Sequence, residues 1–170
     1  MKTRLKICLS LLISAFGLQA ALAQDSGQTD AKRVQGYVFV APSIFVDGIS
    51  RTRSALHTGA GGEFLVYKGL GVGTEIGYFT PWSDWSSGLA IWSLDGSYHF
   101  TRNRRLSPFV TGGYSLGFRS RTANLINFGG GVNYWFRSGS GIRLEFRDNV
   151  NTEYFRNLHY ISFRIGYSFR

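Results

Sequence analysis

The chain is short of cysteine, of helical periodicity and of long apolar runs, and each absence excludes a class of protein. Its single cysteine is Cys8, so the sequence after it can form no disulfide, thiol nucleophile or thiolate metal site. Three prolines are present, and no long segment repeats with the period of an amphipathic helix. After residue 23 no apolar run reaches about 18 residues, which excludes a helix that spans a membrane. Glycine, by contrast, is abundant at 22 of 170 residues, above the usual share of about 7%.

The first 23 residues have the pattern of a secretory signal peptide. A basic start is followed by an apolar run, Ile7 to Leu18, and by the small-residue sequence Ala21-Leu22-Ala23. The apolar run is shorter than the roughly 20 residues of a spanning helix, so we expect cleavage after Ala23 rather than an uncleaved anchor. Cleavage removes three basic residues and lowers the formal charge from +9 to +6.

The remaining chain is predicted to be one domain. Residues 24–32 are polar, lack periodicity and read as a flexible lead-in. Residues 33–170 contain eight segments with β-strand character. These segments are Arg33–Val46, Ser54–Lys68, Leu70–Thr80, Ser87–Phe100, Pro108–Phe118, Leu125–Arg137, Gly141–Arg147 and Leu158–Arg170.

The connections between these segments alternate between turns and loops, as in a bacterial outer-membrane barrel with periplasmic termini. Three connections are expected to be turns, at 68–69, 101–107 and 138–140. Four are expected to be outer loops, at 47–53, 81–86, 119–124 and 148–157. An even number of segments fits the same architecture. The fold class predicted is therefore all-β, an eight-stranded antiparallel up-and-down transmembrane barrel.

Seven of the eight segments separate apolar from polar residues with a period of two. In the last segment, for example, Phe163 and Ile165 alternate with Ser162 and Arg164. The apolar row is predicted to face lipid: Phe64, Val66, Leu70, Val72, Ile76, Tyr78, Ala90, Trp92, Leu94, Tyr98, Phe100, Val110, Tyr114, Leu116, Phe118, Ile126, Phe128, Val132, Tyr134, Phe136, Ile142, Leu144, Phe146, Ile161, Phe163, Ile165, Tyr167 and Phe169. The first segment is ambiguous, because Tyr37 and Phe39 make one row apolar and Val38 and Val40 the other.

A soluble sandwich or lipocalin-like barrel would instead turn the apolar rows inward. The aromatic residues favour the membrane barrel, because they gather at both ends of the strands, as interfacial girdles do. The two sets are Tyr78, Phe79, Trp82 and Trp85 at one end, and Tyr98, Phe100, Phe109, Tyr134, Trp135 and Phe136 at the other.

Two consecutive segments give the chain a resemblance to a known family. Residues 129–136 read Gly-Gly-Gly-Val-Asn-Tyr-Trp-Phe, and residues 141–148 read Gly-Ile-Arg-Leu-Glu-Phe-Arg-Asp. This sequence resembles the small outer-membrane β-barrel domain family of OmpA- and OmpX-like eight-stranded barrels. The resemblance implies a barrel fold and recognition by the outer-membrane assembly machinery, although Arg170 follows the aromatic Phe169 at the position where the family usually ends on an aromatic.

The polar rows carry seven charged residues that are predicted to meet inside the barrel. They are Glu63, Glu75, Asp95, Arg143, Glu145, Arg147 and Arg164. An eight-stranded barrel is just wide enough for its own side chains, and buried charges are tolerated when they are paired. We expect a cross-lumen network of ion pairs that acts as a permanent plug, with a gate for small ions as the alternative.

Five arginines fall in the predicted outer loops: Arg51, Arg53, Arg119, Arg121 and Arg156. Arginine suits phosphate because its planar guanidinium donates two parallel hydrogen bonds. Contact with lipopolysaccharide phosphates is therefore one interpretation of these residues, and ordinary solvated loop charge is the other. Nucleic acid is not an expected partner, because the chain is exported and lacks a binding module.

No catalytic or metal site is predicted. Some eight-stranded barrels that modify lipid A use a His-x-Ser motif, but here His159 and Ser162 are three residues apart and point to opposite faces of a strand. His57 and His99 are isolated imidazoles inside the barrel, so neither a metal nor another cofactor is expected. The sequence thus predicts a monomeric outer-membrane protein with a closed lumen and a structural or interaction role. The alternatives are a narrow solute channel and a lipid A-modifying enzyme.

Overall fold

The computed structural model describes residues 33–46, 52–101, 105–151 and 158–170. The predicted signal peptide (1–23) and the predicted lead-in (24–32) lie outside these ranges. In the described ranges, no helix is both long enough and apolar enough to cross a membrane. The strands are β1 Val34–Val46, β2 Thr52–Tyr67, β3 Leu70–Pro81, β4 Leu89–His99, β5 Leu106–Phe118, β6 Thr122–Trp135, β7 Ser140–Asn151 and β8 Leu158–Phe169, with the short 3₁₀ turn η1 Trp85–Ser87 after β3.

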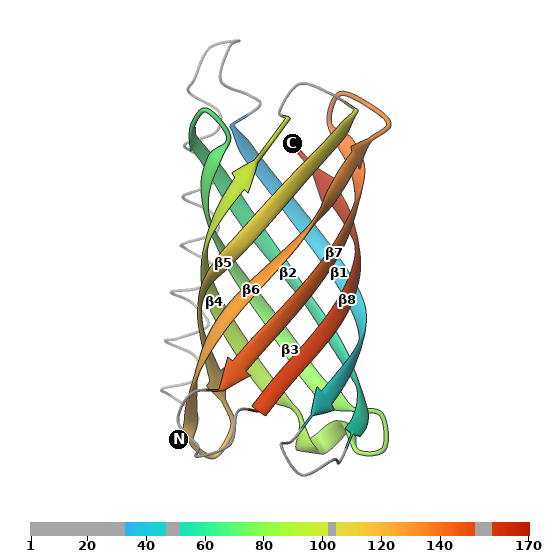
Figure 1. The fold of residues 1–170 in the computed structure, drawn as a ribbon. Coiled ribbons are helices and arrows are strands. Elements are labelled where there is room, and N and C mark those ends of the chain that lie inside the picture. Colours follow the sequence, from blue (N-terminus) through green and yellow to red (C-terminus); the bar gives the residue numbers. More distant parts are fainter. Residues whose placement is uncertain (1–32, 47–51, 102–104, 152–157) are drawn as a thin grey trace, which may run out of the picture.

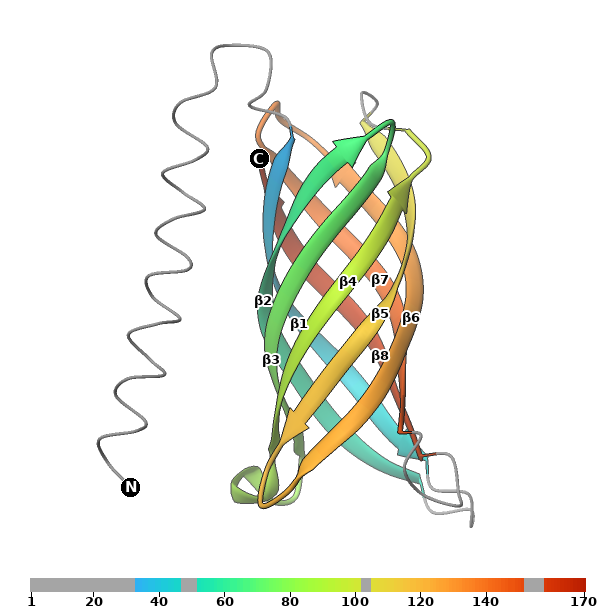
Figure 2. The same cartoon turned by 90° about the vertical axis from the view of Figure 1, so that its left-hand side faces the viewer.

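Each strand pairs with the next in antiparallel fashion, and β1 pairs with β8 to close the barrel (Figures 1 and 2). The predicted fold class is therefore confirmed. Closure satisfies the backbone hydrogen bonds of every strand and leaves no sheet edge. The strands are steeply tilted around the barrel axis, and strands β2, β4 and β6 all end at the same end of the barrel, as Figure 1 shows.

The tightest connection is the two-residue turn between β2 and β3. Lys68 and Gly69 both adopt positive φ, at 41° and 95°, as a two-residue hairpin loop requires. A Cβ on Gly69 would collide with the carbonyl oxygen of His99. Glycine is therefore needed here both for its backbone conformation and for this close approach.

The predicted outer loops are shorter than the sequence suggested. Strand β7 continues to Asn151 and β6 begins at Thr122, so residues 148–151 and 122–124 are strand rather than loop. Polar residues such as Asp148 and Asn149 read as loop from sequence, yet they pair with Ile161 and Tyr160 of β8. Hydrogen bonding to a neighbouring strand overrides weak local propensity here.

The side chains face outward or into the lumen as the alternation of apolar and polar residues predicted. Most of the predicted outward apolar residues are exposed, while Leu116, Val132 and Ile161 are partly covered by neighbours. The ambiguity of the first strand is resolved by burial: Tyr37, Phe39 and Ala41 face the lumen, and Val38 and Val40 face outward. Small inward groups alternate with the large ones, so the lumen is filled by side chains.

The aromatic prediction was wrong for three residues. Phe79, Phe109 and Trp135 lie on inward rows and are 5%, 2% and 3% exposed, so they belong to the lumen and not to the girdles. The period of two decides their direction, and clustering along the sequence does not reveal it. The other members of the two sets are exposed on the outer surface: Tyr78, Trp82, Trp85, Tyr98, Phe100, Tyr134 and Phe136.

Candidate functional site

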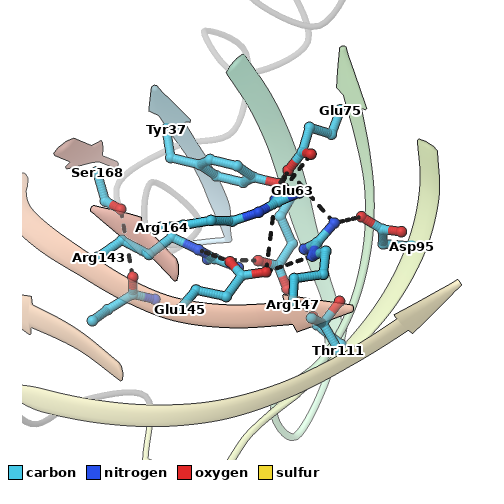
Figure 3. A network of polar contacts seen from close by, with 12 residues as sticks. Tyr37, Glu63, Glu75, Asp95, Thr111, Arg143, Glu145, Arg147, Arg164 and Ser168 are labelled. Carbon is cyan, nitrogen blue, oxygen red and sulfur yellow. Dashed lines mark hydrogen bonds and ion pairs between the residues drawn. The ribbon is translucent and has the colours of Figure 1, made fainter. Parts of the chain in front are cut away.

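The lumen has a charged middle, centred on Glu145 of β7 (Figure 3). One carboxylate oxygen accepts a hydrogen bond from Nε of Arg143 at 2.8 Å, and the other accepts one from Nε of Arg147 at 2.6 Å. Nη1 of Arg164 on β8 lies 3.7 Å from the same carboxylate. Residues 143, 145 and 147 share the inward row of one strand, which places one acid between two bases.

Two further acids reach this centre from the opposite wall. Arg147 Nη1 donates to Asp95 Oδ2 on β4 at 2.8 Å, and Arg164 Nη1 donates to Glu75 Oε2 on β3 at 2.8 Å. Arg147 also approaches Glu75, with 3.6 Å between Nη1 and Oε2. In the closed order of strands, β3 and β7 lie on opposite sides. The ion pairs therefore span the lumen and tie the two walls together.

Glu63 of β2 forms the part of the network nearest the turn between β2 and β3. Its carboxylate lies 2.9 Å from Nε2 of His99 and accepts a 2.6 Å hydrogen bond from Gln35. Ser97 donates to it as well. Arg143 Nη1 is 4.0 Å away, so Glu63 connects this polar layer to Glu145 through Arg143.

Aromatic rings cover the guanidinium groups that carry the network. The guanidinium carbon of Arg143 lies 4.4 Å from the ring centre of Tyr37 and 3.9 Å from that of Phe109. That of Arg164 lies 4.3 Å from the ring centre of Phe39. Tyr37 also donates its hydroxyl hydrogen to Glu75 Oε2 at 2.9 Å. These rings exclude water and add cation–π attraction to each arginine.

The seven predicted lumen residues are thus brought into one network, and each is at least 93% buried. We call these seven residues the plug. Sequence reasoning missed several neutral members of its surroundings, including Tyr37, Gln35 and Asn127. Asn127 donates to Asp95 at 2.8 Å. The inward parity of Asn127 on β6 was a signal that could have found it, whereas Gln35 and Tyr37 lie on the first strand, whose two rows the sequence does not orient.

The outer-loop end of the lumen is built differently. A cavity of about 530 Å³ opens there between β1, β2, β3, β4 and β8. Its apolar lining comes from Phe45, Ala55, Phe79, Pro81, Leu89 and Tyr160, and its polar lining from Arg53, Ser54, Ser83, Asp84, Ser87 and Arg119. We call these twelve residues the mouth cavity.

The predicted loop arginines separate into three groups. Arg53 and Arg119 are exposed and line the mouth cavity. Arg121 is exposed just before β6 and is not among the cavity residues. Arg51 and Arg156 lie outside the described residues.

The three histidines do not meet. His57 is fully buried and packs between Phe39 and Phe79, with ring centres 5.0 and 5.8 Å away. His99 belongs to the Glu63 layer. His159 lies outside near the loop end, where its Nδ1 is 2.7 Å from Asp148 Oδ2. In the part of the chain that the structure describes, no three His, Cys, Asp or Glu side chains are grouped as metal ligands.

His159 and Ser162 lie on opposite faces of β8. The hydroxyl of Ser162 is buried in the lumen and accepts a hydrogen bond from Ser43 at 2.9 Å, whereas the His159 side chain is 36% exposed. The two side chains therefore cannot act on one substrate atom.

Several solved structures share this architecture. The N-terminal β-barrel domain of Pseudomonas aeruginosa OprF aligns with a TM-score of 0.54 and 16% identity, covering 78% of this chain and 97% of that one. Neisserial surface protein A aligns with a TM-score of 0.60 and 10% identity, covering 80% and 96%. Ail, the attachment invasion locus protein of Yersinia pestis, aligns with a TM-score of 0.56 and 13% identity, covering 80% and 97%.

No family model and no curated protein sequence matches the chain. At these low identities the structural likeness establishes the fold, while activity has to be argued from the site. The resemblance to OmpA- and OmpX-like barrels is thus confirmed for the fold: the chain is a small eight-stranded antiparallel barrel like those of the solved outer-membrane proteins.

Proposed function

We propose that this protein is a non-conducting bacterial outer-membrane barrel with a structural or interaction role in the cell envelope. Its outward apolar wall would contact acyl chains, and the exposed loop-end arginines would contact lipopolysaccharide phosphates. The outer-membrane assembly machinery would insert it as a monomer after removal of its signal peptide. The outer-membrane proteins that share the fold support this location.

The plug is the observation that carries the proposal. Arg143, Arg147 and Arg164 reach acids on β2, β3, β4 and β7 at the middle of the lumen. An ion that enters from one end meets these paired groups and the rings that cover them. Opening a path would require separating buried ion pairs, which is costly in a site with little water. The same arrangement argues against the narrow-channel alternative.

Among the described residues, the arrangement of His159 and Ser162 argues against the lipid A-modifying alternative. The residues nearest to a His-x-Ser motif lie on opposite faces, and the polar partner of His159 is Asp148. We therefore propose a protein without catalytic activity. Mass spectrometry of lipid A from cells with and without the protein tests this point, and the expected result is identical spectra.

Planar bilayer recording tests the plug directly. The folded protein, identified by heat-dependent gel mobility, is inserted at known amounts beside a general porin as a positive control. We expect the porin to give discrete current steps and this protein to give none. Steady current steps from the wild-type protein, in proportion to the amount inserted, would contradict the proposal.

A further inference from the structure

The mouth cavity combines an apolar floor with two arginines that have no ionic partner among the described residues. Its residues continue the lumen-facing rows beyond the plug, since Arg53, Ala55 and His57 alternate along β2 and Phe79 follows Glu75 on β3. The volume of about 530 Å³ lies within the usual range of small-molecule sites, about 300–1,000 Å³.

The floor is a packed aromatic layer. The ring of Tyr160 lies 5.0 Å from that of Phe45 and meets the ring of Phe79 edge-on at 5.2 Å. Ala55 and Phe79 are buried, and Leu89 and Tyr160 pack against them. Such a layer offers ring faces and alkyl groups to a ligand but hydrogen-bonds little, so it favours an apolar group of similar size.

The rim carries two arginines whose charge the described residues do not neutralise. Neither Arg53 nor Arg119 makes a side-chain hydrogen bond or ion pair with any residue in the ranges that the structure describes. The carboxylate in the rim is Asp84, which accepts hydrogen bonds from the amide and hydroxyl of Ser86 at 3.0 and 2.6 Å. These bonds, from the Ser86 hydroxyl first, lower the pKa of Asp84 below its ordinary value. The described rim therefore keeps an excess of positive charge.

We propose that the mouth cavity binds a small amphipathic anion from the aqueous phase. A ring or short alkyl chain would pack on Tyr160, Phe45 and Phe79, and a carboxylate, sulfonate or phosphate would pair with Arg53 and Arg119. The plug lies deeper in the lumen than the floor of the cavity and stops the ligand from passing through the barrel. This site would make the protein a receptor or scavenger for such solutes. Arg53 and Arg119 would then pair with the solute, which leaves Arg121, outside the cavity, for contact with lipopolysaccharide.

A binding titration with naphthalene-2-sulfonate tests the site. The protein is placed in phosphatidylcholine nanodiscs, and binding is measured by calorimetry against empty discs. We expect saturable binding, at least about tenfold weaker in each of Arg53→Gln and Arg119→Gln, because each loses a charge-assisted contact. Arg121→Gln removes the same charge outside the cavity and is expected to bind like wild type.

Two further probes distinguish the contribution of the floor to binding from that of the rim. Neutral naphthalene tests the floor alone and inorganic sulfate tests the rim alone, and each is expected to bind more weakly than the combined molecule. Tyr160→Ala, verified as folded by heat-dependent gel mobility, is expected to weaken the sulfonate but not the sulfate. Equal affinity of wild type and the Arg53→Gln/Arg119→Gln double variant for naphthalene-2-sulfonate would overturn the site.

The source of the anion is tested by the lipid composition. In nanodiscs that contain phosphatidylglycerol, we expect the affinity for the probe to be unchanged, because the cavity opens at the loop end of the barrel rather than on its outer wall. Loss of probe binding in these discs, while Arg121→Gln behaves like wild type, would show that a lipid headgroup fills the cavity and would overturn the assignment to a free solute.

Discussion

The plug and the mouth cavity share strands β2, β3, β4 and β8, yet their arginines have opposite surroundings. In the plug, Arg147 contacts three carboxylates at 2.6–3.6 Å. At the mouth, Arg53 and Arg119 are exposed and line a cavity whose floor is aromatic. The difference shows that the depth of a charge within the barrel decides whether it supports the fold or remains available to a ligand.

The physical reason is the cost of removing charge from water. Burying a guanidinium without a carboxylate partner would lower the free energy of unfolding by roughly 3–5 kcal/mol. The acids and bases in the middle of the lumen are therefore in contact with one another. An exposed guanidinium stays hydrated and needs no partner. The comparison predicts large stability effects in the plug, smaller ones away from it, and almost none at the mouth.

The largest effect is expected for Glu145→Ala. The change leaves Arg143 and Arg147 without their closest carboxylate, and we expect a loss of about 4 kcal/mol in the free energy of unfolding. Urea titration in lipid vesicles, followed by heat-dependent gel mobility, measures it. Glu145→Gln keeps the shape and two polar atoms, and it should be less harmful. A loss below about 1 kcal/mol for Glu145→Ala would show that the plug does not stabilise the barrel.

The next largest loss of stability is expected when a charged residue replaces an apolar one on the outward face. Phe163 lies near the middle of β8 and is 49% exposed. Phe163→Arg is expected to cost about 3 kcal/mol, because the guanidinium would meet acyl chains. Phe169→Arg, at the end of the same strand, serves as the matched control and is expected to cost less than about 1 kcal/mol. Equal costs at both depths in the urea titration would argue against a lipid-facing wall.

Removing the hydroxyl of Tyr37 tests how much an uncharged neighbour stabilises the plug. Tyr37→Phe removes the hydrogen bond to Glu75 and keeps the ring over Arg143. We expect a loss of about 2 kcal/mol, because the bond is buried and made to a charged group. Tyr167→Phe removes an exposed hydroxyl that donates to Ser140 at 2.8 Å, and the same titration should show little change. A similar loss of unfolding free energy in both variants would show that the buried hydrogen bond of Tyr37 is no stronger than the exposed one of Tyr167.

The smallest effect is expected at the mouth. Arg119→Ala removes an exposed side chain that makes no ion pair with the described residues, so the free energy of unfolding should change by less than about 0.5 kcal/mol. The variant should still lose affinity for naphthalene-2-sulfonate. Destabilisation comparable to that of Glu145→Ala would show that the mouth is also held together by its charges.

The alternation of residues was enough to predict the barrel, the direction of most side chains and the seven residues of the plug. It could not orient the first strand, because Tyr37 and Val38 are both apolar and burial alone separates them. It also placed Asp148 in a loop, because a polar residue in a paired strand looks like a loop residue until its partner is known. The barrel mouth was hidden because Phe45, Phe79 and Tyr160 come from three strands that are distant in sequence.

The division between plug and mouth is tested most directly by hydrogen exchange at the arginine side chains. Nitrogen-15 labelled protein is observed by nuclear magnetic resonance above neutral pH, and signals are assigned with single Arg→Lys variants. We predict that the Nε protons of Arg143 and Arg147 exchange slowly, since both are buried and donate to Glu145, while those of Arg53 and Arg119 exchange too fast to detect. Equally fast exchange at all four arginines would contradict a closed, ion-paired lumen.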